Sequence, residues 1–123
     1  MNLPPASSLN HEFGLMPFWF WNDDLNEQEL LRQIDDFASH GVGGFVIHPR
    51  MGLPCSIGWM SDRLLHFMKC ATDEAARRGL KVILYDEGMY PSGSSSGQVV
   101  KEDPSLACRC LAWVSADAPV PAG

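Results

Sequence analysis

The segment Gly44–His48, with the sequence GFVIH, indicates the fold class of this chain. Its continuous apolar run ends in a histidine, which predicts a strand buried on both faces. Two comparable runs lie before and after it, Met16–Trp21 (MPFWFW) and Leu80–Tyr85 (LKVILY). Aromatic and β-branched residues favour strands. We therefore expect three strands, at about residues 16–21, 44–48 and 80–85.

The segments between these strands have helical periodicity. Asn26 and Glu29 have the spacing of a capping box at the start of a helix expected over residues 26–40. Ser61 caps a second helix, expected over residues 61–78. In both segments apolar residues recur at helical spacing and a glycine follows the last turn. The order strand, helix, strand, helix, strand predicts right-handed βαβ crossovers and a parallel sheet.

Composition excludes several classes of protein. The chain has 123 residues, 46% of them hydrophobic and 20% charged, which is typical of one globular domain. Its net charge of -6 disfavours nucleic acid and anionic membranes as partners, because both are bound through clustered Lys and Arg. No apolar run approaches the ~18 to 20 residues that cross a bilayer. We therefore expect no nucleic-acid partner and no membrane span.

The two ends of the chain predict less regular structure. Residues 1–15 are expected to be a lead-in, and residues 16–103 to hold the strands and helices. Residues 104–123 are expected to form an extra strand at Leu106–Val114 and then a frayed end. The N-terminal stretch has no basic start and no apolar h-region, which favours a cytoplasmic location. A full-length parent protein in the periplasm or outside the cell is the alternative.

The cysteines have neither disulfide-framework nor zinc-site spacing. We expect ordinary reduced thiols that behave as small hydrophobic residues. The chain has four: Cys55, Cys70, Cys108 and Cys110.

Polar residues follow all three expected strands where each strand ends. The carboxyl ends of parallel strands lie at one edge of the sheet, and open α/β sheets and (β/α)₈ barrels both bind their ligands there. The sequence therefore predicts a ligand site at this edge. The candidates are Trp21 and Asn22 after the first strand, His48 and Arg50 after the second, and Asp86, Glu87, Tyr90 and Ser92 after the third.

Asp86 and Glu87 are the candidates for acid–base chemistry. A carboxylate directly after a buried strand is partly desolvated, so its pKa is open to tuning. Neighbours on a strand point to opposite faces, however, so these two are badly placed to flank one glycosidic bond. Arg50 needs a carboxylate or a hydroxyl-rich ligand nearby. Its structural alternative is an ion pair with Asp86 or Glu87.

Structural interpretations stay open for the remaining candidates. Asn22 suits a turn, and Trp21 suits either the core or stacking on a sugar ring. For His48, the alternative is a buried histidine that bonds a backbone carbonyl. His48 together with Asp86 also suggests a metal-assisted hydrolase, although a third ligand is missing.

Four segments carry a family resemblance: WFWN (Trp19–Asn22), GGFVIHPRMGL (Gly43–Leu53), Trp59 and LYDEGMYPSG (Leu84–Gly93). In this order they resemble the start of the catalytic barrel in large bacterial glycoside hydrolases of the α-L-rhamnosidase type. The similarity runs from about Pro17 to Pro104. It implies a (β/α)₈ barrel that hydrolyses a terminal sugar by inversion, with two glutamates and, in some members, a calcium ion near the sugar. By motif position the sugar pocket would be lined by Trp21, Asn22, His48, Arg50, Asp86 and Glu87.

A complete barrel takes about 250 residues, so the three strands correspond to the first three of eight. We expect an N-terminal fragment that contributes part of the sugar site and is inactive alone, with Glu87 and Asp86 in auxiliary roles. Its uncovered sheet edge predicts self-association. The alternative is a small non-catalytic α/β module that binds sugar or a protein through Trp19, Trp21 and Tyr90.

Overall fold

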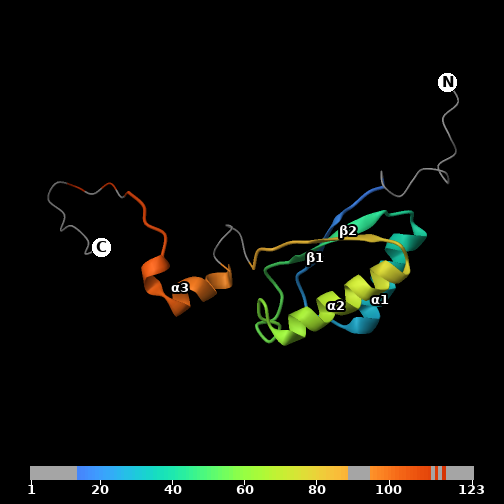
Figure 1. The fold of residues 1–123 in the computed structure, drawn as a ribbon, viewed down its shortest axis with the longest axis horizontal. Helices are drawn as coiled ribbons and strands as arrows, with labels where there is room; N and C mark the ends of the chain where they lie inside the picture. Colours follow the sequence, from blue (N-terminus) through green and yellow to red (C-terminus); the bar gives the residue numbers. More distant parts are fainter. Residues whose placement is uncertain (1–13, 89–94, 112, 114, 116–123) are drawn as a thin grey trace, which may run out of the picture.

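A computed structural model describes residues 14–88, 95–111, 113 and 115 (Figure 1). Three parallel strands form one sheet in the order β1-β2-β3: β1 (Phe18–Trp21), β2 (Gly44–Pro49) and β3 (Lys81–Leu84). Helix α1 (Glu27–Ser39) connects the first pair and α2 (Asp62–Arg77) the second. The small parallel α/β fold is therefore confirmed. In the part of the chain that the structure describes, no helix is long and apolar enough to cross a bilayer.

Both helices begin at the caps that the sequence predicts. The Asn26 side chain accepts a hydrogen bond from the Glu29 backbone N–H, and the Ser61 side chain accepts one from Leu64. In α1 only this first hydrogen bond of the capping box is present. The Glu29 carboxylate accepts hydrogen bonds from Arg32 and does not bond back to the Asn26 backbone N–H. Figure 1 shows α1 and α2 side by side on one face of the sheet.

The core lies between this face and the two helices. Alternate strand residues point into it, so Trp19, Phe45 and Ile47 are all buried. The Trp19 ring meets Phe45 edge-on, with 5.0 Å between ring centroids, and Phe37 of α1 likewise at 5.6 Å. Buried aromatic pairs in this geometry add about 0.5 to 1.5 kcal/mol beyond their area burial.

An ion-pair network joins the two helices at their C-terminal ends. The Glu74 carboxylate accepts hydrogen bonds from Arg77 and Arg78, and Arg78 also reaches Asp35 of α1. These bonds lower the pKa of Glu74 from 4.5 to about 2. The Glu74 side chain is only 13% exposed, so solvent screens the network less than it screens a fully exposed pair.

The second face of the sheet has no layer over it in the described part of the chain. Phe18, Phe20 and Ile83 lie on this uncovered face and are 56%, 43% and 47% exposed. Strand β2 is buried along almost its whole length, as expected. The expectation of a buried third strand is wrong, because β3 is at the edge of the sheet and Leu84 is 59% exposed.

The extra strand expected at Leu106–Val114 is absent from the described residues of that segment. After β3 come a 3₁₀ turn (Ser95–Gly97), the short helix α3 (Gln98–Glu102) and a second 3₁₀ turn (Pro104–Leu106). The Asp103 side chain starts this last turn by accepting from the Ser105 backbone N–H. Leu111 and Trp113 are almost fully exposed. Apolar composition predicted a strand here, but no neighbouring strand pairs with these residues.

Candidate functional site

The loop after β2 packs against the end of β1. The Arg50 backbone N–H donates to the Trp21 carbonyl oxygen at 2.9 Å. Gly52 has φ +107°, and a Cβ atom there would lie 2.1 Å from the Asn22 carbonyl oxygen. Only glycine allows this close approach of two backbones. The carboxyl ends of β1 and β2 are therefore held together, as the sequence predicts.

An open cleft of about 720 Å³ lies between this loop and the segment that follows β3. Arg50 and Trp59 line one side, and Gly88 and Lys101 line the other. The two sides are connected, since Gln98 Nε2 donates to the Trp59 carbonyl oxygen at 2.9 Å. Clefts of this size accommodate small organic ligands.

An aromatic cluster, formed by Phe18, Phe20, His48 and Tyr85, lies on the uncovered face beside this edge. The His48 ring stacks on Tyr85, with 3.8 Å between ring centroids, and meets Phe20 edge-on at 5.1 Å. The Arg50 guanidinium lies over the Phe20 ring, 4.8 Å from its centroid. Arg50 therefore belongs to both the cleft and the cluster.

Tyr85 connects the cluster to a carboxylate. Its hydroxyl donates to Glu87 Oε2 at 2.9 Å. This hydrogen bond, together with desolvation and the charge of Glu87, raises the pKa of Tyr85 above its ordinary value of 10. The phenol therefore stays protonated at neutral pH and holds the Glu87 carboxylate in place.

His48 does not have the backbone partner that its structural alternative requires. Its Nδ1 atom is buried and has no hydrogen-bond partner among the described residues. A buried nitrogen without a partner carries a desolvation cost of about 1 to 3 kcal/mol. A ligand hydroxyl that bonded Nδ1 would offset that cost.

The Trp21 side chain lies in the hydrophobic core and not in the sugar pocket that the resemblance implies. Its side chain points to the helix-covered face, is 2% exposed and packs edge-on against Trp19. Trp21 and Asn22 line a separate cavity of about 100 Å³ between β1 and the start of α1. Strand alternation explains this placement, because Phe20, one residue earlier, points to the opposite face.

The structure does not show the ion pair that was the alternative for Arg50, and it places the two carboxylates after β3 differently. Arg50 forms no ion pair with Asp86 or Glu87, and its guanidinium lies over an aromatic ring instead. Asp86 is exposed and lines neither cavity, because the strand before it is at the sheet edge. Glu87 is the better placed of the two carboxylates. The predicted candidates Tyr90 and Ser92 lie outside the described residues.

Phe18, Phe20 and Tyr85 were not predicted as site residues from the sequence. A signal was present, because residues two apart on a strand share a face, and Tyr85 lies two residues before Glu87. Within residues 14–88 and 95–111, His48 and Asp86 do not belong to any group of three metal-ligating side chains. The metal-assisted alternative therefore still has only two ligands.

Comparisons with protein-family models, with curated proteins and with solved structures find no match to this chain. The resemblance to α-L-rhamnosidases thus stays a prediction from sequence motifs.

Proposed function

We propose that this chain carries part of the sugar-binding site of a glycoside hydrolase of the α-L-rhamnosidase type. The site lies at the carboxyl ends of three strands that are part of a (β/α)₈ barrel. The observation that carries the proposal is the cleft at that edge, which Arg50 joins to an aromatic cluster containing His48.

The arrangement of strands and helices is compatible with a barrel origin. The strands are parallel and adjacent in chain order, and both helices lie on one face (Figure 1). One half of a doubly wound sheet has the same arrangement, so the choice of a barrel rests on the sequence motifs that resemble the α-L-rhamnosidase barrel. In a barrel the helices lie outside and the second face points inward, where further side chains cover it. The exposed Phe18, Phe20 and Ile83 are the residues that such an interior would bury.

The chemistry of the edge suits a sugar. A pyranose ring has apolar C–H faces and a rim of hydroxyl groups, so it needs aromatic surface with a few polar groups. Trp59 offers an indole ring, Arg50 a guanidinium with five donors, and Glu87 an acceptor. A 6-deoxy sugar such as rhamnose also has a methyl group, which fits the apolar rings beside Arg50.

Hydrolysis of a glycosidic bond requires a second, suitably placed carboxyl group that Asp86 and Glu87 do not provide together. A glycosidase needs two carboxyl groups about 5 to 9.5 Å apart across one bond. Asp86 and Glu87 are adjacent in the chain, and only Glu87 is bonded to the aromatic cluster. Glu87 is therefore assigned an auxiliary role, as an acceptor for a sugar hydroxyl. The catalytic pair belongs to other strands of the barrel, and the chain alone has no turnover.

The test is a titration of the chain with L-rhamnose, followed by changes in its NMR spectrum. A partial site is expected to bind in the millimolar range, about -4 kcal/mol. Arg50→Ala removes charged hydrogen bonds worth about 1.5 to 3 kcal/mol and weakens binding tenfold or more. Arg32→Ala is the matched control, because Arg32 is exposed on α1 and its ion-pair partners in the described part of the chain, Glu29 and Asp36, lie on the same helix.

Either of two results would contradict the proposal. One is the absence of saturable binding, and the other is equal affinity in the Arg50→Ala and Arg32→Ala variants. An aryl α-L-rhamnoside assay is run in parallel. Turnover by the chain alone would overturn the auxiliary role of Glu87.

A further inference from the structure

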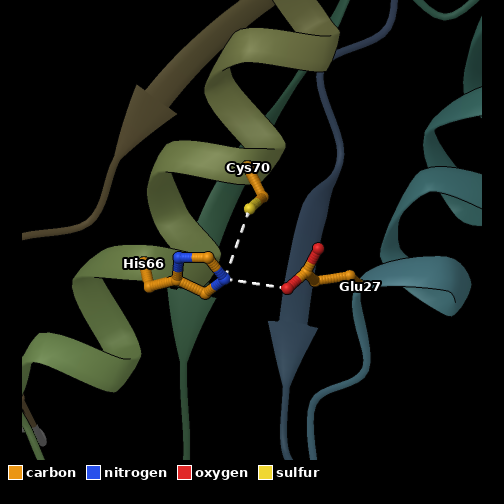
Figure 2. Close-up of side chains that lie close together, drawn as sticks. All are labelled: Glu27, His66 and Cys70. Atoms are coloured by element: carbon orange, nitrogen blue, oxygen red, sulfur yellow. Dashed lines mark hydrogen bonds and ion pairs between the residues drawn. The ribbon is translucent and has the colours of Figure 1, made fainter.

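Three metal-ligating side chains converge between the two helices, away from the cleft. Figure 2 shows Glu27 of α1 facing His66 and Cys70 of α2. His66 Nε2 lies 2.8 Å from Glu27 Oε1 and 3.7 Å from Cys70 Sγ. One oxygen, one nitrogen and one sulfur atom all lie within 4.8 Å of one another. The three donor atoms therefore surround a common point.

The fold explains why they meet. His66 and Cys70 are four residues apart in α2, so they share one face of the helix. Glu27 is the first residue of α1, and the packing of α1 against α2 brings it to that face. The carboxylate is 39 residues away from His66 in sequence. Folding thus assembles the cluster from one local pair and one distant residue.

We propose that Glu27, His66 and Cys70 form a zinc-binding site. Zinc binds carboxylate, imidazole and thiolate ligands at about 2.0 to 2.3 Å, which places two ligands of a tetrahedral site about 3.3 to 3.7 Å apart. The Cys70–His66 separation already has this value. The Glu27–His66 pair has to open by about 0.5 Å when zinc replaces the proton between them.

The donor set selects the class of metal. Magnesium and calcium prefer oxygen ligands, whereas a thiolate with an imidazole favours zinc. Cys70 binds as the thiolate and releases its proton to solvent. Glu27 and His66 are each 55% exposed, so the fourth position faces solvent and takes water or an external ligand. The site joins α1 to α2, so bound zinc stabilises the helix pair.

As a zinc ligand, Cys70 would not be the ordinary thiol that the sequence predicts. The proposed zinc site does not depend on the proposed sugar site, because its residues lie on the helices and line neither cavity. The competing interpretation is a surface ion pair between Glu27 and His66, with Cys70 as a bystander. Such a pair has no thiolate–metal bond, and that difference can be measured.

The experiment is a Co²⁺ titration of the reduced 123-residue chain, followed by absorption spectroscopy. The expected result is a thiolate-to-cobalt charge-transfer band that saturates at one equivalent and disappears when Zn²⁺ is added. Cys70→Ser abolishes the band, and His66→Ala or Glu27→Gln weakens binding tenfold or more. Cys55→Ser and His40→Ala are matched controls, because both residues are exposed and outside the cluster. They leave the band unchanged.

Thermal melts provide a second readout. Zn²⁺ at 100 times its dissociation constant is expected to raise the Tm by about 10 °C in the wild-type chain and in neither Cys70→Ser nor His66→Ala. Far-UV circular dichroism shows whether the variants keep their helices. The proposal is overturned if the cobalt band is missing, survives Cys70→Ser or depends on Cys55. Binding only at millimolar metal also overturns it.

Discussion

Substituting Phe18 by lysine tests whether the uncovered face of the sheet is an interior surface. Phe18 lies on β1, which is an edge strand, and its side chain is 56% exposed on that face. A lysine there places a charge on the apolar surface and disfavours pairing at the edge. We expect the wild-type chain to self-associate through this face and Phe18→Lys to weaken that association.

The size of the effect follows from the exposed area. A phenylalanine side chain presents roughly 200 Å², so the exposed part of Phe18 is about 110 Å². At ~25 cal/mol per Å², burying it contributes about 3 kcal/mol to association. Removing this contribution weakens self-association by about 100-fold.

The assay is sedimentation velocity over a concentration series. Leu65→Lys is the control, because Leu65 is 43% exposed but lies on helix α2 instead of the sheet. We expect Leu65→Lys to associate as the wild-type chain does. The reasoning is refuted if Phe18→Lys associates equally strongly, if Leu65→Lys disrupts association as much, or if the wild-type chain is monomeric throughout.

Three further predictions concern the loop after β2, the helix ion pairs and the aromatic cluster. Gly52→Ala is expected to lower the free energy of unfolding in urea by about 3 kcal/mol, because the new Cβ atom would collide with the Asn22 carbonyl oxygen. Gly41→Ala is the control, since Gly41 has φ +73° and open space around it, and is expected to cost about 1 kcal/mol. Equal losses in the two variants would disprove the close approach at Gly52. Because folding lowers the pKa of Glu74, the carboxylate contributes its full stabilisation above pH 4.5 and loses it as the pH falls toward 2. The melting temperatures of Glu74→Gln and of the wild-type chain should therefore converge as the pH falls over that range. A difference in melting temperature that does not change with pH would contradict this. Glu87→Gln returns the pKa of Tyr85 toward 10 in an ultraviolet pH titration, and an unchanged titration would show that no such hydrogen bond exists.

The sequence predicts the strand and helix pattern well because those signals are local. The continuous apolar run of GFVIH gives β2, and the caps at Asn26 and Ser61 give the starts of both helices. The burial of the third strand was predicted wrongly, because an apolar run does not show whether another strand lies beside it. The segment from Leu106 was misassigned as a strand for the same reason.

The candidate site is only partly encoded in local sequence. Trp21 and Arg50 both follow strands, yet strand alternation sends the Trp21 ring into the core while Arg50 lines the cleft. Stacking of His48 on Tyr85 depends on the register between β2 and β3, which single-strand patterns do not contain. The cluster of Glu27, His66 and Cys70 shows the same limit, since Glu27 reaches His66 only through helix packing.

Size-exclusion chromatography with a thermal melt, with and without L-rhamnose, distinguishes a barrel fragment from a self-contained module. The proposed function makes the chain three strands of a larger barrel, with part of a sugar site at their carboxyl ends. It predicts a chain that associates and gains little thermal stability from the sugar. A monomer with a Tm that rhamnose raises by several degrees would contradict it and identify a self-contained sugar-binding module.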